Sequence, residues 1–360
     1  MVESTTPKER VLLYGNLVVD QIVELPAFPK EDTCQRALSS RRCVGGNGAN
    51  SSRVLAQLAG SRSRRISWVG TVPRRTEAET TFALEELRIN NVDTELLEEA
   101  GGDALPSTYV WVSLDTATRT MVSTRRGTPE LSLRHFEEVV QRAFRDAPQH
   151  GTPSWCHIEC RQPPAATMAL LQAWLRESGK HGGSGKLSLE LEKFWDLAEL
   201  LPLIRLCDHV VVDQSFAERQ LEHTQLIKEQ LEVEEDPPMK RAKTEAPEAH
   251  PASRFLRALG KVLGTPAKGP GPCIVCTWGK EGSFALETGA SKLTHQPAIL
   301  QQKAVDSVGA GDTFIASYLH ARLSGASTQA SLHCGAAVAG RKVGQVGFTN
   351  LRSALPDELR

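Results

Sequence analysis

Strand-like and helix-like segments alternate through the middle of the chain, and this alternation restricts the fold more than any other feature. We expect helices over 131–144 and 165–178, and extended runs over 154–159, 187–192 and 210–212. Strands that are separated by helices are joined by right-handed crossovers, pair in parallel and are covered on both faces. The sequence therefore predicts an α/β protein with a mainly parallel central sheet.

An apolar run near the N-terminus extends this sheet. The segment from Val11 to Asp20 is almost continuously apolar and ends in an acid, which is typical of a buried parallel strand with a polar residue at its carboxyl end. Ligands of open α/β sheets bind at that edge. We expect Asp20 to lie there, although an Asp that simply begins a turn fits the sequence equally well.

The composition is typical of an ordinary soluble protein. Its 360 residues are 40% hydrophobic and carry a net charge of −1, which provides no bulk attraction to nucleic acid or to anionic membranes. The first ten residues are polar, and no apolar run reaches the length needed to span a bilayer. We therefore expect a cytoplasmic protein.

The cysteines predict neither disulfides nor zinc. Eight cysteines in a chain of this length are not a disulfide framework, and Cys273 and Cys276 fall inside an apolar run that reads as a buried strand. Cys156, His157 and Cys160 have no fourth partner at suitable spacing for a structural zinc site.

The stretch Asp306-Ser-Val-Gly-Ala-Gly-Asp-Thr-Phe314 stands immediately before a helix-like run. Gly309 and Gly311 allow the backbone to aim successive N–H groups at one point, and the first amides of the helix suit an anion. We interpret Gly309, Ala310 and Gly311 as a phosphate cradle. The Asp312 carboxylate would repel that anion unless it acts on a neutral hydroxyl beside it; the alternative is that Asp312 caps the helix.

This motif resembles the C-terminal signature of the ribokinase family of sugar and nucleoside kinases. The stretch Gly45-Gly-Asn-Gly-Ala-Asn50, which runs into a helix-like segment that ends at Gly60, resembles the N-terminal sugar-binding signature of the same family. The resemblance implies one kinase domain over 1–360 with a ribokinase-like three-layer sandwich and a small β-sheet lid. The likeness is strongest to the ketohexokinase branch, which phosphorylates the 1-hydroxyl of fructose.

The resemblance also assigns roles to individual residues. Asp312 becomes the general base for the acceptor hydroxyl, and Arg119 becomes the lid arginine that screens the transferred group. The sugar contacts fall on Asp20, Asp32, Gly46, Asn47 and Asn50, and the ATP and phosphate contacts fall on Gly309, Ala310, Gly311, Trp278 and Gly282. Helix capping by the asparagines and core packing by Trp278 remain alternatives. At a helix N-terminus we expect a low pKa for Asp312.

The family likeness further implies ATP, Mg²⁺ and K⁺ as cofactors, a small sugar as substrate, and a homodimer joined through the lid strands. These lid strands fall at about 33–44 and 107–124, where residues 108–114 and 118–123 read as a hairpin. The metal ligands stay unknown. Many relatives have an Asn-x-x-Glu motif where this chain has Asp213-Gln-Ser-Phe216.

The charged, proline-containing segment 229–252 predicts a disordered insert.

Three other functions compete with ketohexose phosphorylation. A kinase for ribose or adenosine would carry the same signatures, and a catalytically silent sugar- or nucleotide-binding regulator would retain part of them. A dinucleotide-binding oxidoreductase is disfavoured, because Gly46-x-Gly48-x-x-Ser51 is a broken version of its glycine fingerprint.

Overall fold

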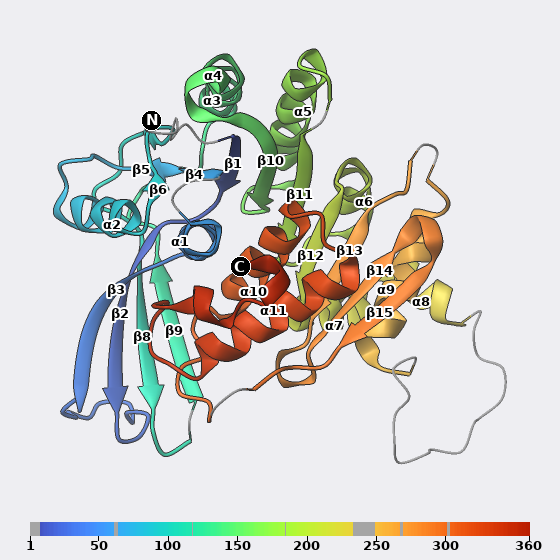
Figure 1. The fold of residues 1–360 in the computed structure, drawn as a ribbon. Coiled ribbons are helices and arrows are strands. Elements are labelled where there is room, and N and C mark those ends of the chain that lie inside the picture. Colours follow the sequence, from blue (N-terminus) through green and yellow to red (C-terminus); the bar gives the residue numbers. More distant parts are fainter. Residues whose placement is uncertain are drawn as a thin grey trace.

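The computed structural model describes residues 8–60, 64–116, 118–183, 185–232, 249–266, 269–300 and 303–360. Figure 1 shows a large sheet between helices, with a smaller sheet at one end. Most of the predicted insert, residues 233–248, lies outside the described residues. No helix within the described ranges is long and apolar enough to cross a membrane.

The described strands include a nine-stranded sheet in the order β15-β14-β13-β12-β11-β10-β1-β4-β6. Its members are β1 (Glu9–Tyr14), β4 (Arg64–Val69), β6 (Val92–Asp93), β10 (Thr152–Glu159), β11 (Lys186–Leu191), β12 (His209–Asp213), β13 (Cys273–Thr277), β14 (Ser283–Glu287) and β15 (Lys292–Gln296). Neighbours pair in parallel except at β13–β14 and β14–β15, which are antiparallel. The mainly parallel sheet is confirmed.

Helices cover both faces of this sheet, which makes the predicted three layers. Along β1, Leu12 and Tyr14 pack in one core, and Val11 and Leu13 pack in the other, as the two-residue period of a strand requires. The first core is covered by α3 (Leu133–Arg145), α5 (Pro164–Lys180), α6 (Leu197–Leu206), α7 (Gln214–His223), α8 (Gln225–Glu232) and α9 (Pro251–Leu263), with α4 (Ala147–His150) following α3. The second is covered by α1 (Asn47–Ala59), α2 (Ala78–Ile89), α10 (Ala310–Leu323) and α11 (Thr328–Val343).

The small sheet has the order β3-β2-β8-β9. Its strands are β2 (Val18–Leu25), β3 (Ser39–Gly45), β8 (Ser107–Ser113) and β9 (Thr118–Thr124), and β5 (Thr71–Val72) pairs separately with β7 (Glu98–Glu99). The predicted hairpin of β8 and β9 is confirmed, and these strands pair antiparallel. The first lid strand begins at Ser39 rather than near residue 33, and β2 pairs between β3 and β8.

The prediction of one strand from Val11 to Asp20 is wrong. The chain leaves the large sheet after Tyr14 and enters the small sheet at Val18. Between them the Asn16 amide donates to the Glu159 carboxylate (2.8 Å), and a Cβ at Gly15 would lie 2.7 Å from the Gly48 backbone. The apolar pattern hides this break because residues on both sides of it are buried. Asp20 therefore approaches the site from the small sheet.

Candidate active site

A cavity of about 620 Å³ adjoins one of about 420 Å³ where the large sheet, the small sheet and α10 meet. We call these the larger and the smaller cavity. Both are lined by Arg119, Asp213, Thr277, Ser307, Ala310 and Gly311. A ligand in one cavity can therefore touch a ligand in the other.

The predicted phosphate cradle forms the boundary between the cavities. Gly309 is the N-cap of α10 with a φ of 74°, and a Cβ on it would run into the Phe348 ring. The Ala310 amide donates a hydrogen bond to the Ser307 carbonyl (3.2 Å). The first hydrogen bond of the helix runs from the Thr313 amide to the Gly309 carbonyl (2.9 Å). The amides of Gly311 and Asp312 are the helix-opening donors between them, which suits an anion.

Asp312 does not cap the helix, since Gly309 holds the N-cap position. Asp312 lies in the first turn of α10 and lines the smaller cavity, where its carboxylate accepts a 2.6 Å hydrogen bond from Asn50 Nδ2. The expectation of a low pKa is wrong. Burial raises the pKa of Asp312 well above its usual range and the neighbouring Glu190 raises it further, while the Asn50 hydrogen bond opposes the rise.

Acidic side chains from the carboxyl ends of β10 and β11 face Asp312 across the smaller cavity. Asn47, in the first turn of α1, donates to Glu190 Oε1 and Glu192 Oε2, both at 3.0 Å. Glu190 is 7% exposed, and burial raises the pKa of its carboxyl group, with a further rise from Glu159. Its second oxygen, Oε2, lies 3.6 Å from Nε2 of buried His157, and neither atom has a hydrogen-bond partner among the described residues.

Asp20 lies on β2 and also lines the smaller cavity. Burial raises the pKa of Asp20 to about 6. The charge of Arg53 and a hydrogen bond from Thr108 lower this pKa, but by less than burial raises it. Gly46 lines the same cavity and precedes α1 with a φ of 96°, a conformation that favours glycine. The smaller cavity thus brings together residues from both signatures and from the small sheet.

Arg119 connects the small sheet to the phosphate cradle. It lies on β9, lines both cavities and donates to the Ser307 hydroxyl at 3.0 Å. The predicted lid arginine therefore lies over the boundary between the cavities.

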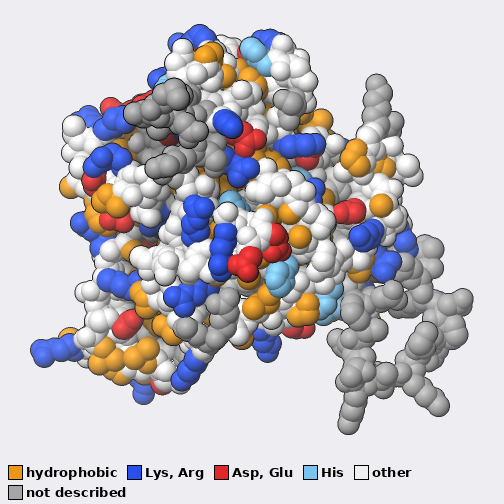
Figure 2. Space-filling model, viewed as in Figure 1, with side chains coloured by type: hydrophobic (Ala, Val, Ile, Leu, Met, Phe, Trp, Pro, Cys, Tyr) orange, Lys and Arg blue, Asp and Glu red, His pale blue; other side chains and the backbone are white. Residues whose placement is uncertain are grey.

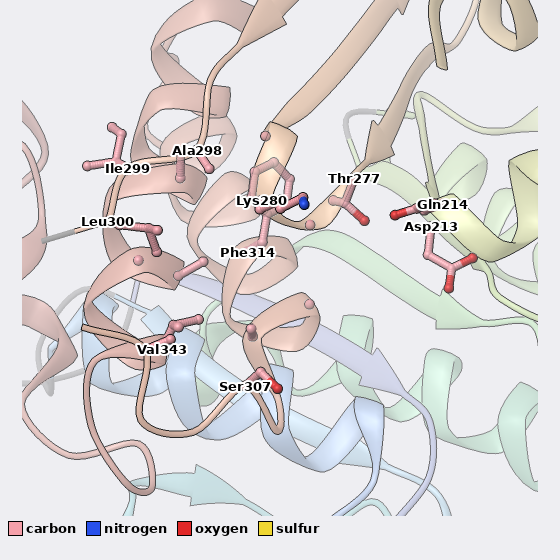
Figure 3. A pocket seen from close by; sticks show the side chains of 18 of the residues that line it. Asp213, Gln214, Thr277, Lys280, Ala298, Ile299, Leu300, Ser307, Phe314 and Val343 are labelled. Atoms are coloured by element: carbon pink, nitrogen blue, oxygen red, sulfur yellow. The ribbon is translucent and has the colours of Figure 1, made fainter. Parts of the chain in front are cut away.

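The larger cavity has an apolar and a polar side. Figure 3 shows Asp213, Gln214 and Thr277 on one side and the apolar Ala298, Ile299 and Leu300 on the other. Gly282 lines this cavity, and so does Gly340 of α11, where a Cβ would run into the Ile299 carbonyl. An apolar side and an adjoining cluster of backbone donors fit a base and its phosphates.

Two predicted site residues lie elsewhere. Trp278 is 4% exposed and packs edge-on to His250, with ring centres 5.1 Å apart, and it lines neither cavity. The indole is held in the core because it follows β13 and faces α9, so core packing describes it. Asp32 is exposed at a φ of 57° between β2 and β3, and it also lines neither cavity of this chain.

Sequence reasoning missed several residues of the site. Glu190 stands inside an apolar strand, and Asp213, Thr277 and Ser307 were given no role. The only available signal was positional, because Glu190, Asp213 and Thr277 lie at the carboxyl ends of adjacent parallel strands, where ligands of such sheets bind.

Comparison with known proteins shows what the chain is similar to. Residues 258–354 match the pfkB family of carbohydrate kinases. The chain resembles that family over this segment. It is 28% identical to mouse ketohexokinase over 345 residues, which cover 96% of this chain and 99% of the relative.

Solved structures support the fold. A ribokinase from Arabidopsis thaliana complexed with ribose and ATP is 20% identical with a TM-score of 0.67, over 98% of this chain and 96% of the other. An adenosine kinase from Sinorhizobium meliloti has the same identity and TM-score, over 98% of each chain. The fold is ribokinase-like, as predicted.

Proposed function

We propose that the protein is an ATP-dependent sugar kinase that transfers the γ-phosphoryl group to a hydroxyl of a ketohexose, with fructose as the acceptor and fructose 1-phosphate as the product. The observation that carries this proposal is the shared boundary of the two cavities at Ala310 and Gly311, with Asp312 beside it on the smaller side. The matches to the pfkB family and to mouse ketohexokinase support the same chemistry.

The lining of the smaller cavity favours a small, hydroxyl-rich acceptor. Asp20, Asn47, Asn50, Thr108 and Ser123 provide hydrogen-bonding groups around it. Among the described residues that line it, none is aromatic, whereas a nucleoside base is commonly held by stacking on an aromatic ring. This composition supports a sugar over adenosine.

Asp312 takes the proton of the attacking hydroxyl. Phosphoryl transfer requires mainly positioning and charge stabilisation, which the Gly311 and Asp312 amides and Arg119 would provide at the γ-phosphate. The raised pKa of Asp312 makes its carboxylate a stronger base than an ordinary aspartate.

Mg²⁺ would enter together with ATP. Among the described residues there is no group of three or more His, Cys, Asp or Glu side chains that could hold a metal ion. In phosphoryl-transfer sites, phosphates and waters supply most of the Mg²⁺ ligands, and one or two carboxylates supply the rest. Asp213, at the boundary of the cavities, is the carboxylate that would contact the hydrated ion. When bound, Mg²⁺ neutralises charge on the transferring phosphates.

The small sheet would also join two copies of the chain. Hydrophobic side chains gather over its lower end in Figure 2, and Leu38, Tyr109, Met121 and Val122 are exposed on its strands and connections. We expect a homodimer, and light scattering coupled to size-exclusion chromatography measures its mass directly.

An ADP-release assay with MgATP and fructose, ribose, adenosine or no acceptor tests the activity. We expect turnover that depends on fructose and falls about 10²- to 10⁴-fold in Asp312→Asn. Asp103→Asn, an exposed aspartate in a loop, is the matched control and should keep the wild-type rate. Turnover with adenosine or ribose in place of fructose would move the protein to another branch of the family, and ATP binding without any turnover would support a silent regulator.

A further inference from the structure

A fully buried ammonium group contacts Asp306, three residues before the phosphate cradle. Lys342, on α11, is 0% exposed, and its Nζ contacts the Asp306 carboxylate oxygen Oδ2 at 2.9 Å and the Asp306 carbonyl oxygen at 3.0 Å. A buried ammonium is costly unless it is paired and hydrogen-bonded. The two residues are therefore held together, and Asp306 is the first residue of the glycine-containing turn.

The backbone strengthens this attachment. The Val343 carbonyl accepts from the amides of Val305 (2.8 Å) and Asp306 (3.1 Å), so the end of α11 holds the segment before the cradle. The same helix lines the larger cavity with Ala336, Ala339, Gly340 and Val343. A single helix thus bounds the proposed nucleotide site and carries the cation that contacts Asp306.

The far end of the turn is held by the same group of residues. The Lys342 ammonium lies 5.3 Å from the centre of the Phe348 ring, and this ring occupies the place that a Cβ on Gly309 would need. Asp306 Oδ1 accepts from the Val308 amide at 2.9 Å. The turn from Asp306 to Gly309 is therefore fixed at both ends around Lys342.

A monovalent ion such as K⁺ at this point would need the oxygens that the ammonium already uses. Carbonyl and carboxylate oxygens are the ligands that such a cation prefers. An ion within bonding distance of Asp306 would also lie within a few ångströms of Nζ and would be repelled by it. Arg41 Nη2, 3.8 Å from Asp306 Oδ2, adds a second positive charge. The residues present do not fit K⁺ at Asp306.

We propose that the Lys342 ammonium is the resident cation of the turn from Asp306 to Gly309, which we call the phosphate turn, so that the protein does not require K⁺. Lys342 is then a positioning residue: it neutralises Asp306 and fixes the turn whose amides receive the phosphates. This inference rests on the proposed kinase function.

The test compares the wild-type protein and Lys342→Ala in KCl, NH₄Cl, NaCl and tetramethylammonium chloride at equal ionic strength. We expect wild-type kcat/KM to be the same in all four salts within two-fold. Lys342→Ala removes the ammonium and leaves space for a small cation, so its kcat/KM should fall about 10- to 100-fold in tetramethylammonium and recover at least five-fold in NH₄⁺ or K⁺. Lys342→Met fills the space without charge and should show the loss with no recovery.

Several results would overturn the inference. A K⁺ requirement of the wild-type enzyme would overturn the inference. This measurement uses no variant, so it remains valid even where the variants do not fold. A loss in Lys342→Ala that no cation reverses would mean that the lysine only stabilises the fold. If the wild type phosphorylates no acceptor, the kinase proposal fails, and MgADP affinity measured by calorimetry in the same four salts still tests Lys342.

Discussion

The side chains of Asn50 and Asp312, 262 positions apart in the sequence, form a 2.6 Å hydrogen bond in the lining of the smaller cavity. Asn50 Oδ1 accepts from Arg53 Nη2 at 2.5 Å, which leaves the Asn50 amide group to face Asp312. This contact joins the first turns of α1 and α10, the two helices that carry the signatures. It fixes the direction of the carboxylate that we assign as the base.

Replacement of Asn50 by alanine should therefore reduce the rate more than it reduces stability. The carboxylate would lose its hydrogen bond and its fixed direction, and kcat should fall about 10- to 100-fold. Steady-state kinetics and urea unfolding measure the two effects. Ser52→Ala, a buried polar change on the same helix that removes a bond to the Gly48 carbonyl, is the control and should leave kcat unchanged. A wild-type kcat in Asn50→Ala would show that Asp312 needs no such support.

The pH profile should report the raised pKa of Asp312. A base must be ionised, so kcat/KM should rise with pH through the pKa of the free enzyme, above the ordinary range of an aspartate. Because Glu190 raises this pKa, Glu190→Gln should move the acidic limb to lower pH. Glu85→Gln, which removes a carboxylate from a surface pair with Arg88, should leave the limb in place. A limb that moves to higher pH in Glu190→Gln would contradict the assignment.

Asp20 should reduce stability at neutral pH. Its pKa is about 6 in the folded protein and about 3.8 unfolded, so the folded state binds more protons and stability falls as the pH rises between these values. Asp20→Asn lacks this charge and should be more stable than the wild type, by about 1–3 kcal/mol above pH 6. Its advantage should grow by about 1 kcal/mol between pH 5 and pH 8 in urea unfolding. The KM for the sugar should rise in the same variant, and a constant advantage at both pH values would argue against the raised pKa.

The glycines of the phosphate cradle should respond differently to alanine. Gly309→Ala places a side chain at a φ of 74° against the Phe348 ring and should lower the free energy of unfolding by about 2–4 kcal/mol. A Cβ on Gly311 meets no atom within 4 Å, so Gly311→Ala should fold at least as well as the wild type. Its methyl group would stand at the boundary of the cavities and raise the KM for ATP. Equal stability losses in the two variants would contradict this distinction.

Much of the fold was predictable because its signal is periodic. The predicted helices 131–144 and 165–178, and the strand between them, each keep the same periodic pattern of buried residues along their whole length. The structure places these elements within a few residues of the prediction. The run from Val11 to Asp20 was not divisible in this way. Its residues are buried in two different sheets, and apolar sequence records burial but not the partner strand.

The candidate site was only partly predictable, for electrostatic reasons. Glycines and short polar residues mark a turn in the sequence, and this marked residues 309–311. The pKa of Asp312 depends instead on burial and on Glu190, which comes from β11 and is distant in the chain. The contact between the Lys342 ammonium and Asp306 is likewise not predictable from the sequence, because the residue type alone does not show whether a lysine is buried.

Trp278 provides the last prediction, because core packing and ATP binding require opposite results. Its indole lies in the core against His250 and lines neither cavity. Trp278→Ala should lower the free energy of unfolding by about 3–5 kcal/mol, and Trp278→Phe by less, since the phenyl ring keeps part of the packing. In both variants the folded fraction should bind MgADP with wild-type affinity, which calorimetry at 10 °C measures after the folded concentration has been determined. Thr277→Val, at the preceding position in the chain, loses a hydroxyl at the boundary of the cavities and should show the reverse: nearly full stability with weaker MgADP binding. Weak MgADP binding by a fully folded Trp278→Phe would return the indole to the nucleotide site.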